Sequence, residues 1–60
     1  MSKQQMPILM TLPEVAQRWK ISIKSVRRLI DAKRLGVIRI GKALRISEAE
    51  VVHFERHNSA

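Results

Sequence analysis

The stretch TLPEVAQRWKISIKSVRRLI, from Thr11 to Ile30, decides the fold of this chain. In each half, a hydroxyl residue follows an apolar residue and comes four positions before a valine. This spacing is typical of a helix start, where the hydroxyl caps free backbone N–H groups and the flanking apolar side chains pack together. We therefore expect one helix over residues 11–19 and another over residues 22–33. Because only Lys20 and Ile21 separate them, the two helices must turn sharply, as in a helix-turn-helix.

The same signature occurs a third time, at Ser47 and Val51, and predicts a helix over residues 47–57. Glu14 and Glu50 each stand three positions after a cap, where a carboxylate can accept a hydrogen bond from the backbone N–H of the cap. The residues expected to face the core are apolar and follow helical spacing. They are Leu12, Val15, Ala16, Trp19, Val26, Leu29, Ile30, Val51, Val52 and Phe54.

Residues 37–46 contain two β-prone runs on either side of Gly41 and predict a hairpin. A two-residue loop that begins at Gly41 would pair Arg39 with Leu44 and mix apolar and charged residues on both faces. A loop one residue longer would place Arg39 opposite Arg45. We expect the longer loop because it gathers the apolar residues on one face. Those residues are Ile38, Ile40, Leu44 and Ile46.

The predicted fold is therefore an α+β domain, with three helices and a two-stranded antiparallel hairpin in the order ααββα. We expect this domain to occupy residues 9–57, with a flexible arm over residues 1–8 and a short tail over residues 58–60. Sixty residues suffice for one domain at most, and such a chain buries only about 60% of its unfolded surface. The chain has no cysteine, so no disulfide supports the fold.

Positive charge is concentrated between Lys20 and Arg45. This segment holds nine Lys or Arg residues and one acid, Asp31, so its net charge is nine minus one, or +8. The rest of the chain carries three basic and four acidic residues, so the formal +7 of the whole chain belongs to its middle. Charge gathered on one segment of a small chain indicates a polyanionic partner.

Two sets of residues in this segment are candidates for DNA contacts. The first lies on the predicted second helix and consists of Ser22, Ile23, Lys24, Ser25, Arg27 and Arg28. The second lies on the hairpin and consists of Arg39, Lys42 and Arg45. Facing arginines on a hairpin would repel, and a phosphate backbone or a narrow minor groove would relieve that repulsion. The alternative for both sets is an ordinary solvated surface.

The start of the second helix has its own chemistry. Ser25 stands where the other two helices carry an acid, so this helix end stays open to a phosphate or a base edge. Ile23 follows the cap and is expected to be exposed. It either touches a thymine methyl group or is one of the scattered apolar residues found on any protein surface.

Other kinds of function find little support in the residues. His53 and His57 are one helical turn apart with Glu50 nearby, yet no third strong ligand is evident, so we expect no metal site. We expect neither an enzyme nor a cofactor, because there is no glycine-rich phosphate loop and no Ser/His/Asp arrangement. No run approaches the roughly 18 apolar residues of a membrane span. We therefore expect a cytoplasmic protein with no membrane contact and no small-molecule ligand.

Four segments together resemble the excisionase family of DNA-binding domains, which are small MerR-like winged helix-turn-helix proteins. The segments are Leu9–Ala16, Ile21–Ile30, Ile38–Lys42 and Leu44–Ile46, within a resemblance that extends from about Leu9 to Phe54. The resemblance implies that the second helix enters the major groove, with four of its residues at or beside the DNA, namely Ile23, Lys24, Arg27 and Arg28. It also implies that Ser22 approaches a phosphate, and that the hairpin is the wing, which reaches the adjacent minor groove or the backbone.

The resemblance also implies a biological role. Proteins of this kind bind double-stranded DNA at several sites in tandem, bend it, and help a tyrosine or serine integrase to excise a phage or mobile element. Because a single winged domain buries little surface on DNA, we also expect cooperative self-association on repeated sites. The chain would then be a recombination directionality factor. A small transcriptional regulator of a prophage or mobile-element gene is the alternative on the same fold. A membrane-surface binder is a third reading, disfavoured because the apolar face of the basic helix is committed to the core.

Overall fold

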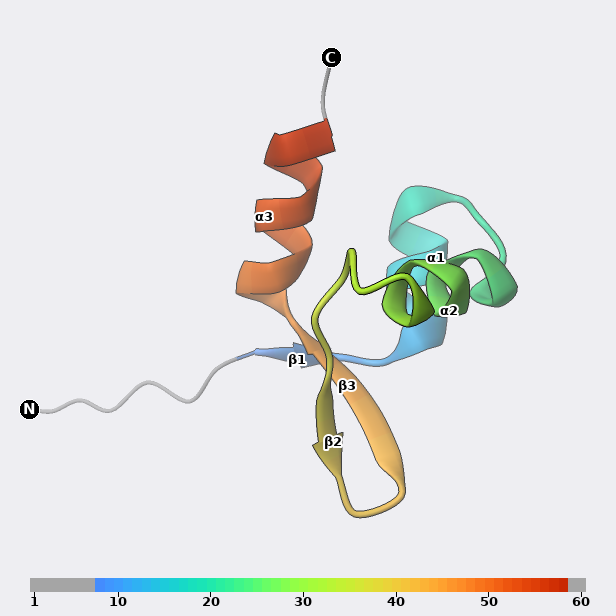
Figure 1. Cartoon of the computed structure of the whole chain (residues 1–60), viewed down its shortest axis with the longest axis vertical. Coiled ribbons are helices and arrows are strands. Elements are labelled where there is room, and N and C mark those ends of the chain that lie inside the picture. The colour runs from blue at the N-terminus through green and yellow to red at the C-terminus, as the bar shows by residue number, and fades with distance from the viewer. Residues whose placement is uncertain (1–7, 59–60) are drawn as a thin grey trace, which may run out of the picture.

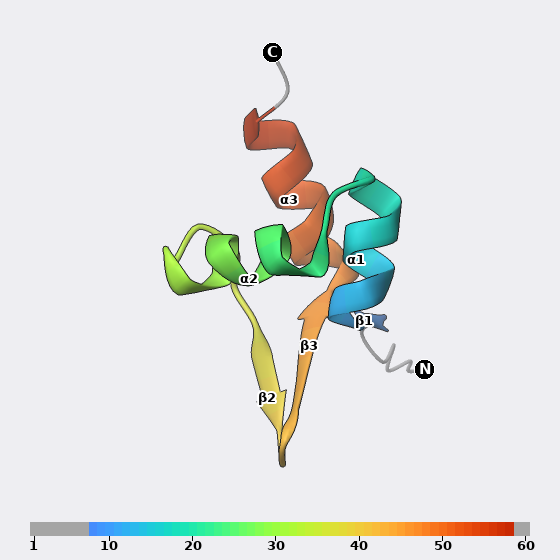
Figure 2. The ribbon, with the colours of Figure 1, turned by 90° about the vertical axis from the view of Figure 1, so that its right-hand side faces the viewer.

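The computed structural model describes residues 8–58, which form three helices and three strands (Figure 1). In chain order these are β1 (Leu9–Met10), α1 (Leu12–Trp19), α2 (Ile23–Asp31), β2 (Ile38–Ile40), β3 (Ala43–Ser47) and α3 (Glu48–Asn58). The predicted α+β class, with three helices and an antiparallel hairpin, is confirmed. Figure 2 shows the hairpin of β2 and β3 projecting away from the helices. Apart from Ile8 and Asn58, the predicted arm and tail lie outside the described residues.

α1 begins at the predicted cap. Thr11 Oγ1 accepts a hydrogen bond from the Glu14 N–H at 3.2 Å, and Glu14 Oε1 accepts one from the Thr11 N–H at 2.8 Å, so the predicted capping box is confirmed. The helix ends at Trp19 and is capped by Lys20, whose φ of 57° is left-handed. The Ile21 N–H then donates to the Ala16 carbonyl at 2.9 Å. This closed, left-handed helix end produces the sharp turn that packs α2 against α1.

α2 has the predicted cap but ends earlier than predicted. Ser22 Oγ accepts a hydrogen bond from the Ser25 N–H at 3.0 Å. The helix ends at Asp31 rather than at Lys33, and Lys33 takes a left-handed φ of 61°. A left-handed residue cannot continue a right-handed helix, so the chain leaves the helix here and turns toward the hairpin.

The hairpin adopts the register that we expected it to avoid. The paired residues are Ile38 and Arg45, Arg39 and Leu44, and Ile40 and Ala43. The loop therefore holds only Gly41 and Lys42, and the predicted three-residue loop is wrong. Gly41 has a φ of 59° and Lys42 is not left-handed, the pattern of a type II′ turn, whose twist matches that of paired strands. Turn geometry outweighs the segregation of apolar side chains, and Ile38 and Ile40 stay 42% and 51% exposed.

A short strand that the sequence did not predict joins the sheet. β1 pairs antiparallel with β3, with Met10 opposite Ile46, and the strand order is β1-β3-β2. The Glu48 N–H donates to the Ile8 carbonyl at 2.8 Å and continues this contact to the start of α3. Two residues are too few to produce a visible alternating pattern, so the strand could not be predicted from periodicity.

α3 begins after Ser47, whose Oγ accepts a hydrogen bond from the Glu50 N–H at 3.1 Å. Glu50 does not complete a capping box, and its predicted role is wrong. Its Oε2 accepts instead from the Gly36 N–H at 3.0 Å. A Cβ built on Gly36 would lie 3.3 Å from this carboxylate, so glycine permits the close approach. The Glu50 carboxylate therefore binds a backbone N–H in the loop before β2 instead of the backbone N–H of the helix cap.

The core is aliphatic and lies where the three helices meet the sheet. Its buried residues are Leu12, Val15, Ala16, Val26, Leu35, Ile46 and Val51. Partly buried side chains pack around it, namely Met10, Trp19, Leu29, Ile30, Leu44 and Phe54. Leu35 is 1% exposed but was not predicted, because it lies in the loop between α2 and β2, outside any periodic pattern. Val52, predicted to face inward, is half-buried.

Glu55 holds α3 against the end of α1. Arg18 Nε and Nη2 donate to its two carboxylate oxygens at 2.7 and 3.0 Å, and Trp19 Nε1 donates to its Oε2 at 2.6 Å. The hydrogen bonds from Arg18 and then from Trp19 lower the pKa of Glu55 from 4.5 to about 2. The rings of Trp19 and Phe54 lie 5.0 Å apart between centroids. These contacts fix the position of α3 against the end of α1.

Candidate nucleic-acid interface

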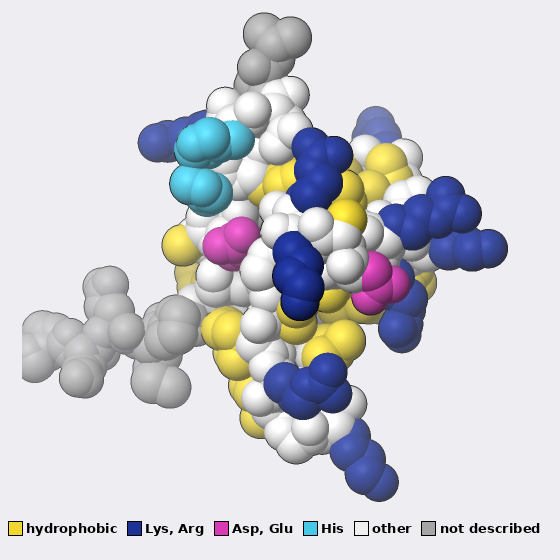
Figure 3. Space-filling model, viewed as in Figure 1, with side chains coloured by type: hydrophobic (Ala, Val, Ile, Leu, Met, Phe, Trp, Pro, Cys, Tyr) yellow, Lys and Arg dark blue, Asp and Glu magenta, His cyan; other side chains and the backbone are white. Residues whose placement is uncertain are grey.

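The cationic side of α2 faces solvent. Val26 is buried and Ile30 packs against the core, so the helical period directs Lys24, Arg27 and Arg28 outward, and all three are exposed. Figure 3 shows Lys and Arg side chains over the helical part of the molecule and along the hairpin. α2 therefore presents a cationic surface on one side while its apolar side packs against the core.

Ser22 and Ser25 bond to one another at the start of α2. The Ser22 hydroxyl accepts from the Ser25 N–H, and the two hydroxyl oxygens lie 3.0 Å apart. Ser22 is exposed, whereas Ser25 is half-buried. The pair fixes the first turn of α2 and thereby the direction in which Ile23 and Lys24 project.

The predicted pairing of Arg39 with Arg45 is wrong. Arg39 lies opposite Leu44, and Arg45 lies opposite Ile38, so the two arginines project from opposite faces of the hairpin. The repulsion inferred from directly facing arginines therefore does not apply. Arg45 is half-buried and its Nη1 donates to the Leu44 carbonyl at 2.8 Å, whereas Arg39 and Lys42 are exposed.

A groove of about 320 Å³ lies between α2, the start of α1 and the hairpin, and we call it the basic groove. It is lined by Thr11, Leu12, Pro13, Arg27, Arg39, Lys42, Leu44 and Arg45. Four of these described residues are cations and none is an acid. Both arginines of the hairpin reach the groove despite leaving opposite faces of the ribbon. The helix and the hairpin, which the sequence analysis treats as separate sets, therefore meet in one place.

The basic groove suits an anion on electrostatic grounds. Cations that converge between low-dielectric walls raise the local positive potential and attract negative charge. Within residues 8–58, the carboxylate–cation contact of the structure joins Arg18 and Glu55, away from the groove. The cations of the groove are therefore available to a phosphate oxygen, with which arginine forms strong charge-assisted hydrogen bonds.

Sequence reasoning placed some residues at the site and missed others. Ile23, Lys24 and Arg28 are exposed on α2 but do not line the basic groove. Residues 11–13, at the start of α1, line it without having been predicted to do so. No local signal could have identified them, because their position depends on how α1 packs against β3.

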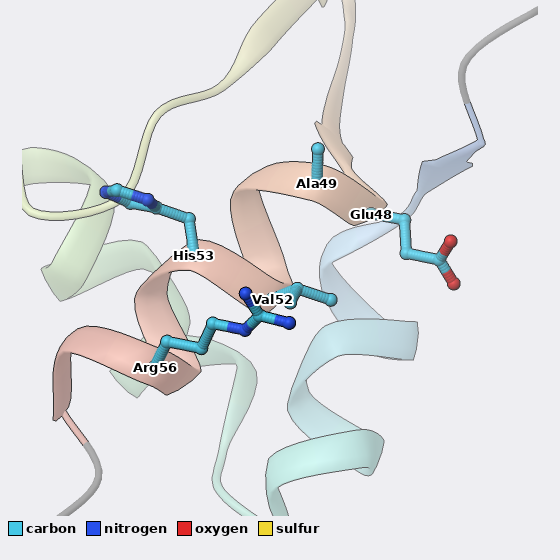
Figure 4. A pocket seen from close by; sticks show the side chains of 5 residues that line it. All are labelled: Glu48, Ala49, Val52, His53 and Arg56. Atoms are coloured by element: carbon cyan, nitrogen blue, oxygen red, sulfur yellow. The ribbon is translucent and has the colours of Figure 1, made fainter.

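Other hollows lie on the described part of the molecule. An apolar one of about 340 Å³ is lined by Trp19, Ile21, Leu29, Phe54, Glu55 and Asn58. Another, of about 450 Å³, lies on α3 and is lined by Glu48, Ala49, Val52, His53 and Arg56 (Figure 4). Figure 4 shows Glu48 and His53 pointing away from one another, so this hollow does not bring polar groups to a common point.

The histidine rings of α3 lie side by side, tilted to one another, on the helix surface. The rings of His53 and His57 lie 4.1 Å apart between centroids, and His57 Nδ1 lies 3.0 Å from the His53 carbonyl oxygen. Among residues 8–58, no group of three His, Asp or Glu side chains is placed to hold a metal ion. Over the same residues, no helix combines the length and the apolar character needed to cross a membrane.

Comparison with known proteins gives one match. A family model described as a helix-turn-helix domain matches residues 9–59, which span α1, α2, the hairpin and α3. The comparisons with curated proteins and with solved structures found no match.

Proposed function

We propose that this chain, which belongs to the helix-turn-helix family of excisionase-like DNA-binding domains, holds duplex DNA with α2 and the hairpin at the same time. The basic groove carries the proposal, because there Arg27 of α2 meets the three cations of the hairpin. α2 occupies the major groove, as the second helix of a helix-turn-helix does. The hairpin reaches the adjacent minor groove, and the strand between the two grooves passes through the basic groove with its phosphates against the cations.

The proposed contacts divide by chemistry. Arg27 and the hairpin cations contact phosphates, which fix the register of the protein on the duplex without reading sequence. Ile23, Lys24 and Arg28 lie on the exposed surface of α2 beyond the basic groove, where they reach base edges or the flanking backbone. Ser22 caps α2 and lies beside a phosphate, with Ser25 holding its hydroxyl in place.

We further propose that the chain acts as an architectural factor in recombination. A single module of this kind buries only about 600–1,000 Å² on DNA, so one copy binds weakly and several copies on tandem sites are needed for stable loading. Bending a site by 40–90° costs about 1–6 kcal/mol, which the contacts of several copies can offset. In this proposal, the bent and protein-coated site helps an integrase to assemble for excision.

An excision assay tests this role. A plasmid that carries attachment sites is incubated with an integrase from the same genome, with and without the chain. We expect excision to depend on the chain, to fall with Arg39→Gln, and to persist with Arg56→Gln, which removes one charge from the α3 surface. If the chain binds the plasmid but never changes excision, the recombination role fails and regulation of a nearby promoter, read with a reporter gene, becomes the better account.

A further inference from the structure

We propose that Ile23 reads the C5-methyl group of a pyrimidine, so that binding responds to thymine and to 5-methylcytosine alike. The inference rests on the proposed placement of α2 in the major groove. It adds both a specificity determinant and a means by which DNA methylation would regulate binding.

Ile23 lies at the part of α2 that would meet the bases. It is the first residue of the helix, and 43% of its surface is exposed. Arg27 follows it by four positions, so the two side chains occupy the same side of the helix. Arg27 lines the basic groove. Ile23 therefore extends the DNA-facing side of α2 toward its N-terminal end, the end from which recognition helices contact base edges.

The comparison with Ile21 indicates that packing does not account for Ile23. Ile21 is 38% exposed, but it lines the apolar hollow beside Trp19 and Phe54. Ile23 lines none of the hollows described above and is not among the apolar side chains packed against the core. Isoleucine also has a lower helix propensity than alanine, so helix formation gives no reason for it at this exposed position.

Among the groups that bases present in the major groove, the C5-methyl group is the one that suits an exposed isoleucine side chain. Guanine, adenine and unmethylated cytosine present polar hydrogen-bonding atoms there, whereas thymine adds an apolar methyl group at C5. Covering a polar base edge with an isoleucine removes water from that edge without replacing its hydrogen bonds, which is unfavourable. Contact with the methyl group instead removes two apolar surfaces from water.

The same contact makes methylation of cytosine a switch for binding. A methyl group at C5 of cytosine occupies the position that the thymine methyl group occupies at that base. A site with cytosine opposite Ile23 would bind weakly when unmethylated and more tightly when methylated. Burial of one methyl group corresponds to a change in affinity of about fourfold.

The test begins with a duplex selected by the wild-type chain from a random-sequence pool. Each thymine of that duplex is replaced in turn by uracil, which lacks only the methyl group. We expect a loss of about fourfold at one or two positions and none at the others. Ile23→Ala should bind the thymine and uracil duplexes equally, whereas the matched control Ile21→Ala should keep the discrimination of the wild type.

A second arm separates the two sources of the methyl group. At the sensitive position the pair is changed to cytosine–guanine, with and without methylation at C5. We expect methylation to raise the affinity of the wild type about fourfold and to leave that of Ile23→Ala unchanged. The proposal is overturned if no uracil or methylcytosine substitution changes affinity, or if Ile23→Ala keeps the discrimination. Loss of the proposed function would appear differently, as failure of the wild type to bind any duplex.

Discussion

Arg27 of α2 and Arg39 of β2 line the same groove, although one lies on a helix and the other on the hairpin. The turn at Lys33 and the loop that follows it carry the chain from one to the other. The two guanidinium groups belong to one basic groove with Lys42 and Arg45, and no acid lines it among the described residues. This shared groove is the basis of our proposal that the two elements bind one stretch of DNA backbone together.

The number of phosphate contacts predicts how binding depends on salt. If about five of the nine cations between Lys20 and Arg45 meet phosphates, the logarithm of the binding constant should fall against the logarithm of salt concentration with a slope of about −4.5. Arg39→Gln should make this slope less steep by about 0.9, because it removes one contact. Arg56→Gln should leave it unchanged. Titrations at several salt concentrations measure the slope, and a value near zero would contradict DNA binding through phosphates.

The ion pair at Glu55 predicts how stability depends on pH. Because hydrogen bonds lower the pKa of Glu55 from 4.5 to about 2, its ionised form favours the folded state. This contribution is present above about pH 4.5 and is lost as the pH falls toward 2. We expect wild type to be more stable than Glu55→Gln at pH 7, and the difference to shrink between pH 4.5 and 2. Thermal unfolding followed by Trp19 fluorescence measures it, and a difference that does not vary with pH would contradict the role of Glu55.

The hairpin turn predicts opposite effects of two mirror-image residues at one position. Gly41 has a φ of 59°, and a Cβ placed there would meet no atom within 4 Å, so any effect of a methyl group comes from the backbone. L-alanine should destabilise the hairpin by more than about 1 kcal/mol, because its Cβ disfavours positive φ. D-alanine, introduced by chemical synthesis, favours positive φ and should stabilise it. Denaturant unfolding measures both, and equal effects of the two residues would contradict the observed turn.

Local chemistry explains which parts of the fold could be predicted. Thr11 and Ser22 bond to backbone N–H groups three residues away, so their signature is complete within one turn of sequence. The core positions of the helices follow from the same local period. Lys33, in contrast, adopts a left-handed conformation at the end of α2, and no signal in the neighbouring sequence predicts this conformation.

Tertiary contacts explain which parts of the fold could not be predicted from the sequence. The hydrophobic pattern favoured a three-residue loop, but the turn preference of Gly41 decided the register, and the exposed Ile38 and Ile40 follow from it. Glu50 accepts a hydrogen bond from the Gly36 N–H, fourteen residues earlier in the chain, and not from the backbone N–H of the expected cap. The geometry of the candidate site also depends on tertiary contacts. Its four cations could be suggested from charge alone, but their meeting in one groove with residues 11–13 depends on how α1, α2 and the hairpin pack.

A double-mutant cycle between Arg27 and Arg39 tests the central claim most directly. DNA affinity is measured for wild type, Arg27→Gln, Arg39→Gln and the double variant, with Arg27 and Arg56 as the control pair. Because two cations that hold the same stretch of backbone depend on one another, the double variant should lose less than the sum of the single losses by at least about 0.5 kcal/mol. The control pair should be additive. Additive losses for Arg27 and Arg39 as well, or no loss from either, would contradict joint binding by α2 and the hairpin.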